Sequence, residues 1–109
     1  MNNILVTGVG SYLPKKVLFN KDLNKNLNTS DEWIKKRTGI TQRHIVSEEE
    51  TTSKMGFYAS KKALENAKLS SKDIDLIVLA TTTPDKTFPA SATSIQHELG
   101  ILNCAAFDI

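Results

Sequence analysis

The chain has 109 residues, enough for one small domain, and its 14 basic and 12 acidic residues give a net charge of +2. The basic residues are mostly lysines scattered along the chain, which argues against a nucleic-acid-binding protein. No apolar run is long enough to span a membrane, and the first residues lack a signal-peptide pattern, so we expect a cytoplasmic protein. The single cysteine, Cys104, excludes an internal disulfide and a cysteine-ligated metal site.

The first half of the chain is predicted to combine short strands with short helices. Residues 4–9 have the composition of a strand that runs into a turn rich in glycine and proline. Asn20 is a candidate N-cap for a short helix, with Leu23 and Leu27 four residues apart on one face. Residues 40–46 are expected to be extended.

A capped helix is predicted over residues 30–38. Thr29 and Glu32 have the spacing of a capping box, which satisfies backbone N–H groups at the start of a helix. Gly39 lies where a left-handed residue commonly ends a helix.

The second half of the chain predicts buried elements. A helix is expected over residues 52–68, where apolar side chains recur every four residues: Met55, Ala59, Ala63 and Ala67. Residues 76–80 are apolar throughout, as in a parallel strand that is buried on both faces. The remaining elements are a capped turn at 70–74, a loop at 84–89, a helix at 90–100 and a strand at 104–109. This order predicts an α/β fold with a parallel component.

The last predicted strand ends without the crossover that a further parallel partner would need. An edge strand at a natural terminus is one interpretation. A truncated chain is the interpretation that we favour.

Several candidate sites fail on their residues. The sequence TGVGSYLP carries Leu13 where the dinucleotide fingerprint needs its third glycine. Cys104 begins an apolar stretch and is expected to be a small hydrophobic residue, not a nucleophile. His44 and His97 have no second ligand or paired carboxylate at a useful spacing, so we expect structural or surface roles. The residues therefore offer no catalytic group and no metal site.

Trp33 and Arg37 are the more informative pair. They lie four residues apart and so share one face of the predicted helix. In one interpretation the tryptophan packs into the core and the arginine extends over it. In the other, the two planar groups bind a planar ligand, and a stacked nucleobase would contribute about 1–3 kcal/mol.

Four stretches together resemble a known family: TSDEWIKKRTGI, TTSKMGFYASKKALENA, DLIVLATTTPDKTFPASA and IQHELGI followed by CAAFDI. In this order they are similar to the first part of beta-ketoacyl-acyl carrier protein synthase III. The resemblance implies a thiolase-like fold of two α/β halves, each with a mixed sheet between helices, assembled as a homodimer. Residues 1–109 would be the N-terminal portion of the first half, truncated at a core strand.

The resemblance also implies a reaction. The family transfers an acetyl group from coenzyme A to a cysteine and condenses it with malonyl-acyl carrier protein, releasing carbon dioxide. Trp33 and Arg37 would flank the adenine of coenzyme A, with Thr29 nearby. Phe88 would cross the dimer interface and close the partner's acyl pocket. The alternative for Phe88 is a loop aromatic packed between the two neighbouring prolines.

The family's nucleophilic cysteine follows the AFD strand, and its histidine and asparagine lie in the second half. We therefore assign no catalytic residue here, no tightly bound cofactor and acetyl-coenzyme A as substrate only. Two alternatives stay open. One is a non-catalytic module for coenzyme A binding or dimerisation, and the other is a related condensing enzyme that makes a polyketide or quinolone.

Overall fold

The computed structural model describes residues 3–23 and 27–109. The chain forms two compact units, which we call the hairpin unit (Leu13–Glu48) and the α/β unit (Met1–Tyr12 with Glu49–Ile109). Within the described ranges, no helix has both the length and the apolar character needed to cross a membrane.

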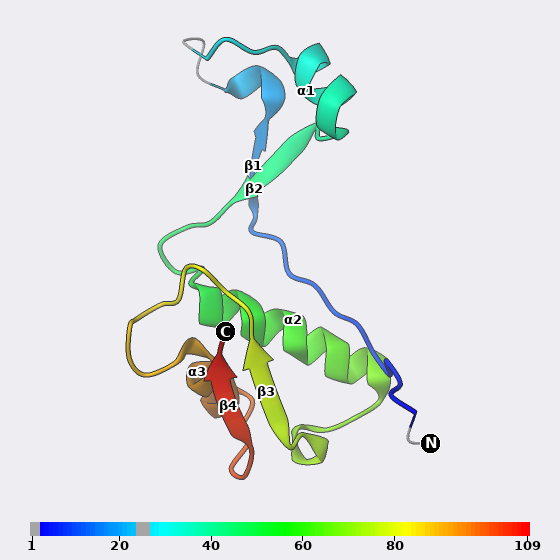
Figure 1. Cartoon of the computed structure of the whole chain (residues 1–109), viewed down its shortest axis with the longest axis vertical. Coiled ribbons are helices and arrows are strands. Elements are labelled where there is room, and N and C mark those ends of the chain that lie inside the picture. Colours follow the sequence, from blue (N-terminus) through cyan, green and yellow to red (C-terminus); the bar gives the residue numbers. More distant parts are fainter. Residues whose placement is uncertain (1–2, 24–26) are drawn as a thin grey trace. The chain divides into compact units, whose positions relative to one another are not determined.

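The hairpin unit is built on two antiparallel strands, β1 (Lys16–Phe19) and β2 (Gln42–Ile45), with Lys16 opposite Ile45 (Figure 1). A short 3-10 helix, η1 (Asn20–Asp22), and helix α1 (Asp31–Thr38) lie between the strands in sequence. The prediction of an extended segment at β2 is confirmed. Strand β1 was not predicted, although its KVLF sequence has the apolar character of a strand.

The N-cap of helix α1 lies one residue later than predicted. The hydroxyl of Ser30, not that of Thr29, accepts a hydrogen bond from Trp33 N–H at 3.1 Å. Gly39 ends the helix with φ of 71°, and its N–H donates to the carbonyl of Lys35. The predicted helix and its C-terminal glycine are confirmed, and the predicted Thr29 cap is wrong because the adjacent serine takes that role.

The short helix predicted from Asn20 is also wrong among the described residues. Only η1 forms, Leu27 is 53% exposed, and residues 24–26 lie outside the described ranges. The Asn20 side chain is instead 5% exposed and makes hydrogen bonds inside the unit. The segment is therefore held by hydrogen bonds of the buried Asn20 amide, and not by an apolar helix face formed by Leu23 and Leu27.

The α/β unit contains α2 (Thr52–Ala67), the 3-10 helix η2 (Ser71–Asp73), β3 (Leu76–Leu79), α3 (Ser91–Glu98) and β4 (Ala105–Asp108). Strands β3 and β4 are parallel, with Leu76 opposite Ala105 (Figure 1). This pairing confirms the parallel component of the predicted α/β fold, and α2 agrees with its predicted range to within one residue.

Helix α3 packs against α2 and against both parallel strands. The apolar core consists of Ala92, Ile95 and Ile101, which are 0%, 2% and 7% exposed. Gly56 of α2 permits this contact, because a Cβ atom there would lie 2.6 Å from Ile95 Cδ1. The core of the unit is therefore centred on α3.

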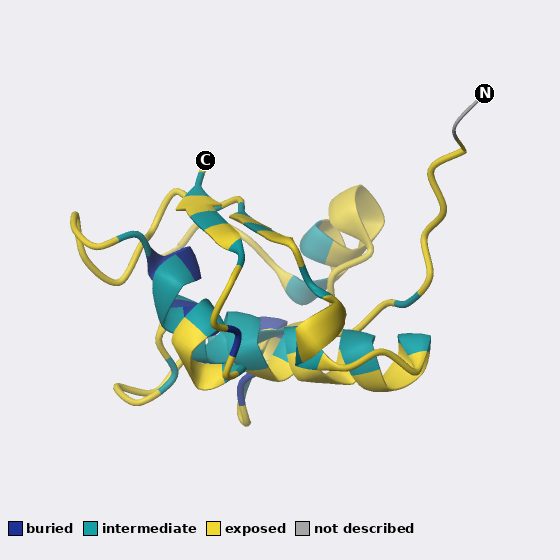
Figure 2. Ribbon diagram, turned by 90° about the horizontal axis from the view of Figure 1, so that it is seen from below, coloured by how far each residue is buried: buried dark blue, intermediate teal, exposed yellow. Residues whose placement is uncertain are grey.

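The prediction that both faces of the parallel strands are buried is wrong. Leu76, Val78 and Phe107 are 53%, 46% and 46% exposed, while Ile77 and Leu79 are partly buried. Exposed and partly buried residues alternate along both strands (Figure 2). Helix α3 packs on both strands, and the side chains of Leu76, Val78 and Phe107 remain about half-exposed.

Residues 4–9 do not form a strand in the structure. Ile4 and Val6 are 97% and 85% exposed, and no described strand pairs with this segment. It passes along α2 instead, where Val9 N–H donates to Asn66 Oδ1. A Cβ atom at Gly10 would come within 2.2 Å of the Ala59 carbonyl oxygen, so the glycine allows close approach to α2.

Candidate functional site

Trp33 and Arg37 form an exposed planar pair on α1. The indole is 54% exposed, and the guanidinium carbon lies 5.2 Å from the centre of its ring. None of the eight residues of α1, all of which are described, is buried. The interpretation of Trp33 as a core residue is therefore wrong, and the pair meets the geometry of a cation–π contact.

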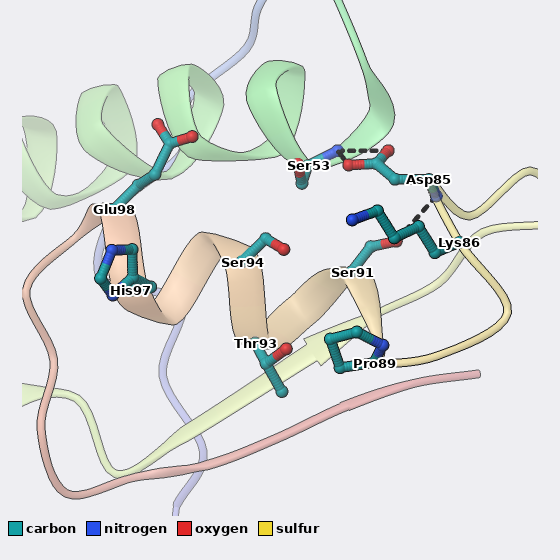
Figure 3. A pocket seen from close by; sticks show the side chains of 9 residues that line it. All are labelled: Ser53, Asp85, Lys86, Pro89, Ser91, Thr93, Ser94, His97 and Glu98. Atoms are coloured by element: carbon teal, nitrogen blue, oxygen red, sulfur yellow. Dashed lines mark hydrogen bonds between the residues drawn. The ribbon is translucent and has the colours of Figure 1, made fainter.

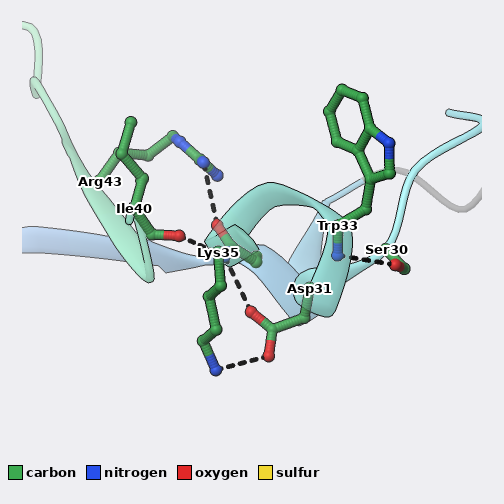
Figure 4. A network of polar contacts seen from close by, with 7 residues as sticks. Ser30, Asp31, Trp33, Lys35, Ile40 and Arg43 are labelled. Carbon is green, nitrogen blue, oxygen red and sulfur yellow. Dashed lines mark hydrogen bonds and ion pairs between the residues drawn. The ribbon is translucent and has the colours of Figure 1, made fainter. Parts of the chain in front are cut away.

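The spacing of this pair limits how a flat ligand can bind. Stacked carbon atoms are separated by about 3.5 Å, so a base between the two groups would need roughly 7 Å. The 5.2 Å separation leaves no such space while the side chains hold these positions. The indole of Trp33 points away from the polar contacts of α1 (Figure 4), which leaves its outer side as the place for a stacked base.

Thr29 is exposed and lies just before the helix start. Its backbone N–H donates to the carbonyl of Leu27 at 2.8 Å. Because Ser30 caps α1, the Thr29 hydroxyl is not needed for capping. Its position at the same end of α1 as Trp33 is compatible with contact to the same ligand.

A buried amide supports this helix. Asn20 Nδ2 donates to Asp31 Oδ1 at 2.8 Å and to the Ile40 carbonyl at 2.7 Å, and Asn20 Oδ1 accepts from Arg43 at 3.0 Å. Figure 4 shows the partners Asp31, Ile40 and Arg43 converging beside α1. Asp31 also pairs with Lys35 at 2.7 Å. The hydrogen bond from Lys35, followed by that from Asn20, lowers the pKa of the Asp31 carboxyl below its usual range.

Phe88, the residue predicted to contact the partner's acyl pocket, lies on the loop between β3 and α3. It is 85% exposed, and the neighbouring prolines are exposed as well. The alternative that Phe88 packs between these prolines is therefore wrong. The structure places Phe88 in the α/β unit and the Trp33–Arg37 pair in the hairpin unit.

Two hydrogen-bonding residues hold the Phe88 loop in place. The Asp85 carboxylate accepts from Ser53 N–H at 3.1 Å, and Asp85 N–H donates to the Ser91 hydroxyl at 2.9 Å (Figure 3). Ser91 is 1% exposed. Asp85 thus anchors the loop to the first turn of α2 through Ser53 and to the first turn of α3 through Ser91.

Asp108 extends this anchoring to the end of β4. Its carboxylate accepts from Ser91 N–H at 2.7 Å and from Ala92 N–H at 2.8 Å, at the N-terminus of α3. Sequence reasoning missed this contact. An aspartate at the carboxyl end of a parallel strand, with a helix that lacks its own side-chain cap, is the pattern that could have indicated it.

A polar hollow of about 410 Å³ lies beside the Phe88 loop (Figure 3). It is lined by Ser53, Asp85, Lys86, Pro89, Ser91, Thr93, Ser94, His97 and Glu98. Its two acidic side chains already have partners, because the Asp85 carboxylate accepts from Ser53 N–H and Glu98 pairs with Lys54 at 2.9 Å. The hollow therefore offers no free carboxylate to a ligand.

The other candidate residues have structural positions. The His44 ring forms a hydrogen bond with the Pro14 carbonyl, which confirms a structural role. Cys104 is partly buried just before β4, and its carbonyl accepts from Gln96. No group of three histidine, cysteine or acidic side chains within residues 3–23 and 27–109 could hold a metal ion.

Comparison with known proteins finds similarity to the family that the sequence motifs resemble. The chain is 56% identical over all 109 residues to beta-ketoacyl-(acyl-carrier-protein) synthase III of Ehrlichia canis, and 52% identical to that of Wolbachia pipientis. Over its whole length the chain is homologous to part of the beta-ketoacyl-(acyl-carrier-protein) synthases III. It spans 34% of the length of each of these two synthases. No family model matches the chain.

Solved structures agree with this assignment. The synthase III of Aquifex aeolicus matches with a TM-score of 0.87 and 51% identity, over 94% of this chain and 33% of that one. The priming beta-ketosynthase of the R1128 polyketide pathway matches with a TM-score of 0.88 and 41% identity, over 95% and 31%. Both matches cover about one third of the solved chain, as the curated matches do.

Proposed function

We propose that this chain contributes the coenzyme A entrance of a cytoplasmic beta-ketoacyl-(acyl-carrier-protein) synthase III. The reaction would join acetyl-coenzyme A and malonyl-acyl carrier protein into acetoacetyl-acyl carrier protein, with release of coenzyme A and carbon dioxide. The identity of 52–56% to synthases of that name supports the proposal. The chain supplies no nucleophile in this scheme, because Cys104 precedes β4 in a loop outside any helix N-terminus.

The observation that carries the proposal is the exposed Trp33–Arg37 pair. A half-exposed tryptophan gains little from its own burial, but its outer face can stack on the adenine of coenzyme A. Arg37 holds the indole from the other side with its guanidinium, which can also attract a phosphate of the ligand. Thr29 would contact the same nucleotide from the residue before the cap.

Phe88 supports the second part of the proposal, a homodimer. A phenylalanine that is 85% exposed on an anchored loop is suited to insertion into another protein surface. In the proposed assembly it closes the acyl pocket of the partner subunit.

A fluorescence titration tests the nucleotide role, since Trp33 is the only tryptophan. We expect coenzyme A to quench Trp33 emission with saturation, and pantetheine, which lacks the nucleotide, to leave it unchanged. Arg37→Ala should weaken the binding of coenzyme A about fivefold or more through the lost support and charge. The matched control is Lys36→Ala, which removes the same charge from an exposed neighbour on α1. Equal quenching by pantetheine and coenzyme A would contradict the proposal.

A related priming ketosynthase is the second candidate. The match to the R1128 polyketide enzyme, with 41% identity, favours it specifically. The higher identity, 56%, to the beta-ketoacyl-(acyl-carrier-protein) synthase III of Ehrlichia canis places it second. The starter group separates the two proposals: a protein that contains this chain should prefer acetyl-coenzyme A for fatty acid synthesis, whereas preference for another acyl group would favour the polyketide type.

A further inference from the structure

We infer that Asn20 is a positioning residue for the Trp33–Arg37 pair, and that it sets the affinity for the nucleotide without touching it. The inference rests on the proposed function for the identity of the ligand. Its structural part, that Asn20 fixes the position of α1, stands on the contacts of the hairpin unit alone.

The first step is that α1 has little apolar anchoring, because Ile34 is the one apolar residue of this fully described helix that is even partly buried. None of its eight residues is buried, so burial of apolar surface does little to hold the helix against β1 and β2. A short helix is marginal in water without such packing. Other contacts must therefore hold α1, and with it Trp33, in one orientation.

The second step is that the Asn20 amide contacts both ends of α1. Nδ2 reaches Asp31, the first residue of the helix, at 2.8 Å. The same nitrogen reaches the carbonyl of Ile40, directly after the terminal Gly39, at 2.7 Å. Both donor hydrogens are thus used, one at each end of the helix.

The third step is that Asn20 is itself fixed to the strands. Its N–H donates to the Thr41 carbonyl at 3.2 Å, and its Oδ1 accepts from Arg43 of β2 at 3.0 Å. With a side chain 5% exposed, its lost bonds could not be replaced easily by water. Asn20 therefore connects α1 to the paired strands by hydrogen bonds and restricts the motion of the helix relative to them.

The principal test is Asn20→Ala in the full 109-residue chain, with coenzyme A as the ligand and Trp33 fluorescence as the readout. We expect the dissociation constant to rise about fivefold or more, because a tilted indole loses part of its stacking. Asn103→Ala, the same change on an exposed loop of the α/β unit, should bind as the unchanged chain does. Unchanged affinity in a folded Asn20→Ala chain would overturn the inference.

A second pair of variants keeps the test decisive if Asn20→Ala does not fold. Asp31→Asn and Asp31→Ala both remove the ion pair with Lys35, but only Asp31→Asn keeps an oxygen that accepts from Asn20. We expect coenzyme A affinity within about twofold of the original for Asp31→Asn and a clear loss for Asp31→Ala. The same loss in both would assign the effect to charge and overturn the role of Asn20.

A ligand-free measurement separates the two proposals. Amide hydrogen exchange in α1 should accelerate in Asn20→Ala and Asp31→Ala, while exchange in α2 stays unchanged. If the original chain fails to bind coenzyme A but α1 exchange accelerates in these variants, the proposed function fails and the positioning role stands. If α1 exchange is the same in every variant, the positioning role is wrong whatever the ligand.

Discussion

The two units of this chain are stabilised by different kinds of interaction. The apolar core residues Ala92, Ile95 and Ile101 all belong to the α/β unit. The hairpin unit instead buries Asn20 and Pro14, and its helix has no buried residue. One unit gains stability from apolar area removed from water, and the other from directed hydrogen bonds around one amide.

The difference matters because the candidate ligand site lies on the unit with the smaller apolar contribution. Hydrogen bonds fix direction, whereas apolar contacts tolerate small shifts. A stacking site needs the Trp33 ring held at one angle. The Asn20 amide, with three fixed hydrogen-bond partners, can hold α1 in that orientation. The comparison therefore predicts that core variants lower the free energy of unfolding, while variants around Asn20 change the position of Trp33 and Arg37.

The largest effect is expected for Ile95→Ala, which empties the centre of the α/β core. A side chain 2% exposed that is cut to alanine costs about 2–5 kcal/mol, depending on how far α2 closes the cavity. Urea unfolding followed by far-ultraviolet circular dichroism measures this loss. Leu102→Ala, at a site 90% exposed, is the control and should change the free energy of unfolding by about 0.5 kcal/mol or less. Similar losses in both variants would show that the core is not centred on α3.

Asp108→Ala should give the next largest effect. It removes both hydrogen bonds that the N-terminus of α3 donates to the Asp108 carboxylate, a loss of about 1–2 kcal/mol. Asp108→Asn should recover part of the loss, because an amide oxygen can still accept one bond. The exposed Asp75, just before β3, provides the control as Asp75→Ala. If Asp75→Ala lowered the free energy of unfolding as much as Asp108→Ala, the capping role of Asp108 would be contradicted.

The sequence predicts the α/β unit better than it predicts the contacts inside it. Helix α2 follows from apolar residues every four positions, and β3 and β4 follow from their continuous apolar runs. Residues 4–9 have the same strand-like composition but no described partner, because pairing depends on residues far away in the sequence. Local composition shows that a segment can be a strand, and only tertiary contacts decide whether it is one.

For the candidate site, too, the sequence predicted the local arrangement but not the contacts between distant residues. The spacing of Trp33 and Arg37 indicated a shared face, and the structure places them 5.2 Å apart. Asn20 was predicted as a helix cap from its residue type alone, whereas it serves as a buried hydrogen-bonding centre. Its partners are 11 to 23 residues away, so no local pattern could reveal them.

A smaller effect separates the two residues that could cap α1. Ser30→Ala should destabilise the helix by about 1 kcal/mol, because Trp33 N–H loses its acceptor. Thr29→Ala should leave helix stability unchanged and, under the proposed function, weaken coenzyme A binding only. Amide exchange of α1 and the Trp33 titration, applied to both variants, measure these two properties. If amide exchange in α1 were faster in Thr29→Ala than in Ser30→Ala, Thr29 would be the cap, as the sequence predicted.

The smallest effect concerns pH and the Asp85 anchor of the Phe88 loop. Desolvation raises the pKa of the Asp85 carboxyl, but the hydrogen bonds from Ser53, Thr51 and Thr52 together outweigh it, so the pKa lies below its usual range. A carboxyl whose pKa is lower in the folded chain stabilises it fully above about pH 5 and loses that contribution as the pH falls below about 4.

Asp85→Asn should remove this part of the pH dependence. Its unfolding free energy, measured in urea from pH 7 down to pH 3, should decline less steeply than that of the original chain below about pH 4. Other carboxyls with lowered pKa values, Asp31 and Asp73, contribute to both curves equally and cancel in the difference. Parallel curves would mean that the Asp85 carboxylate does not hold the loop that carries Phe88, and the loop anchor would then rest on the Ser91 hydroxyl alone.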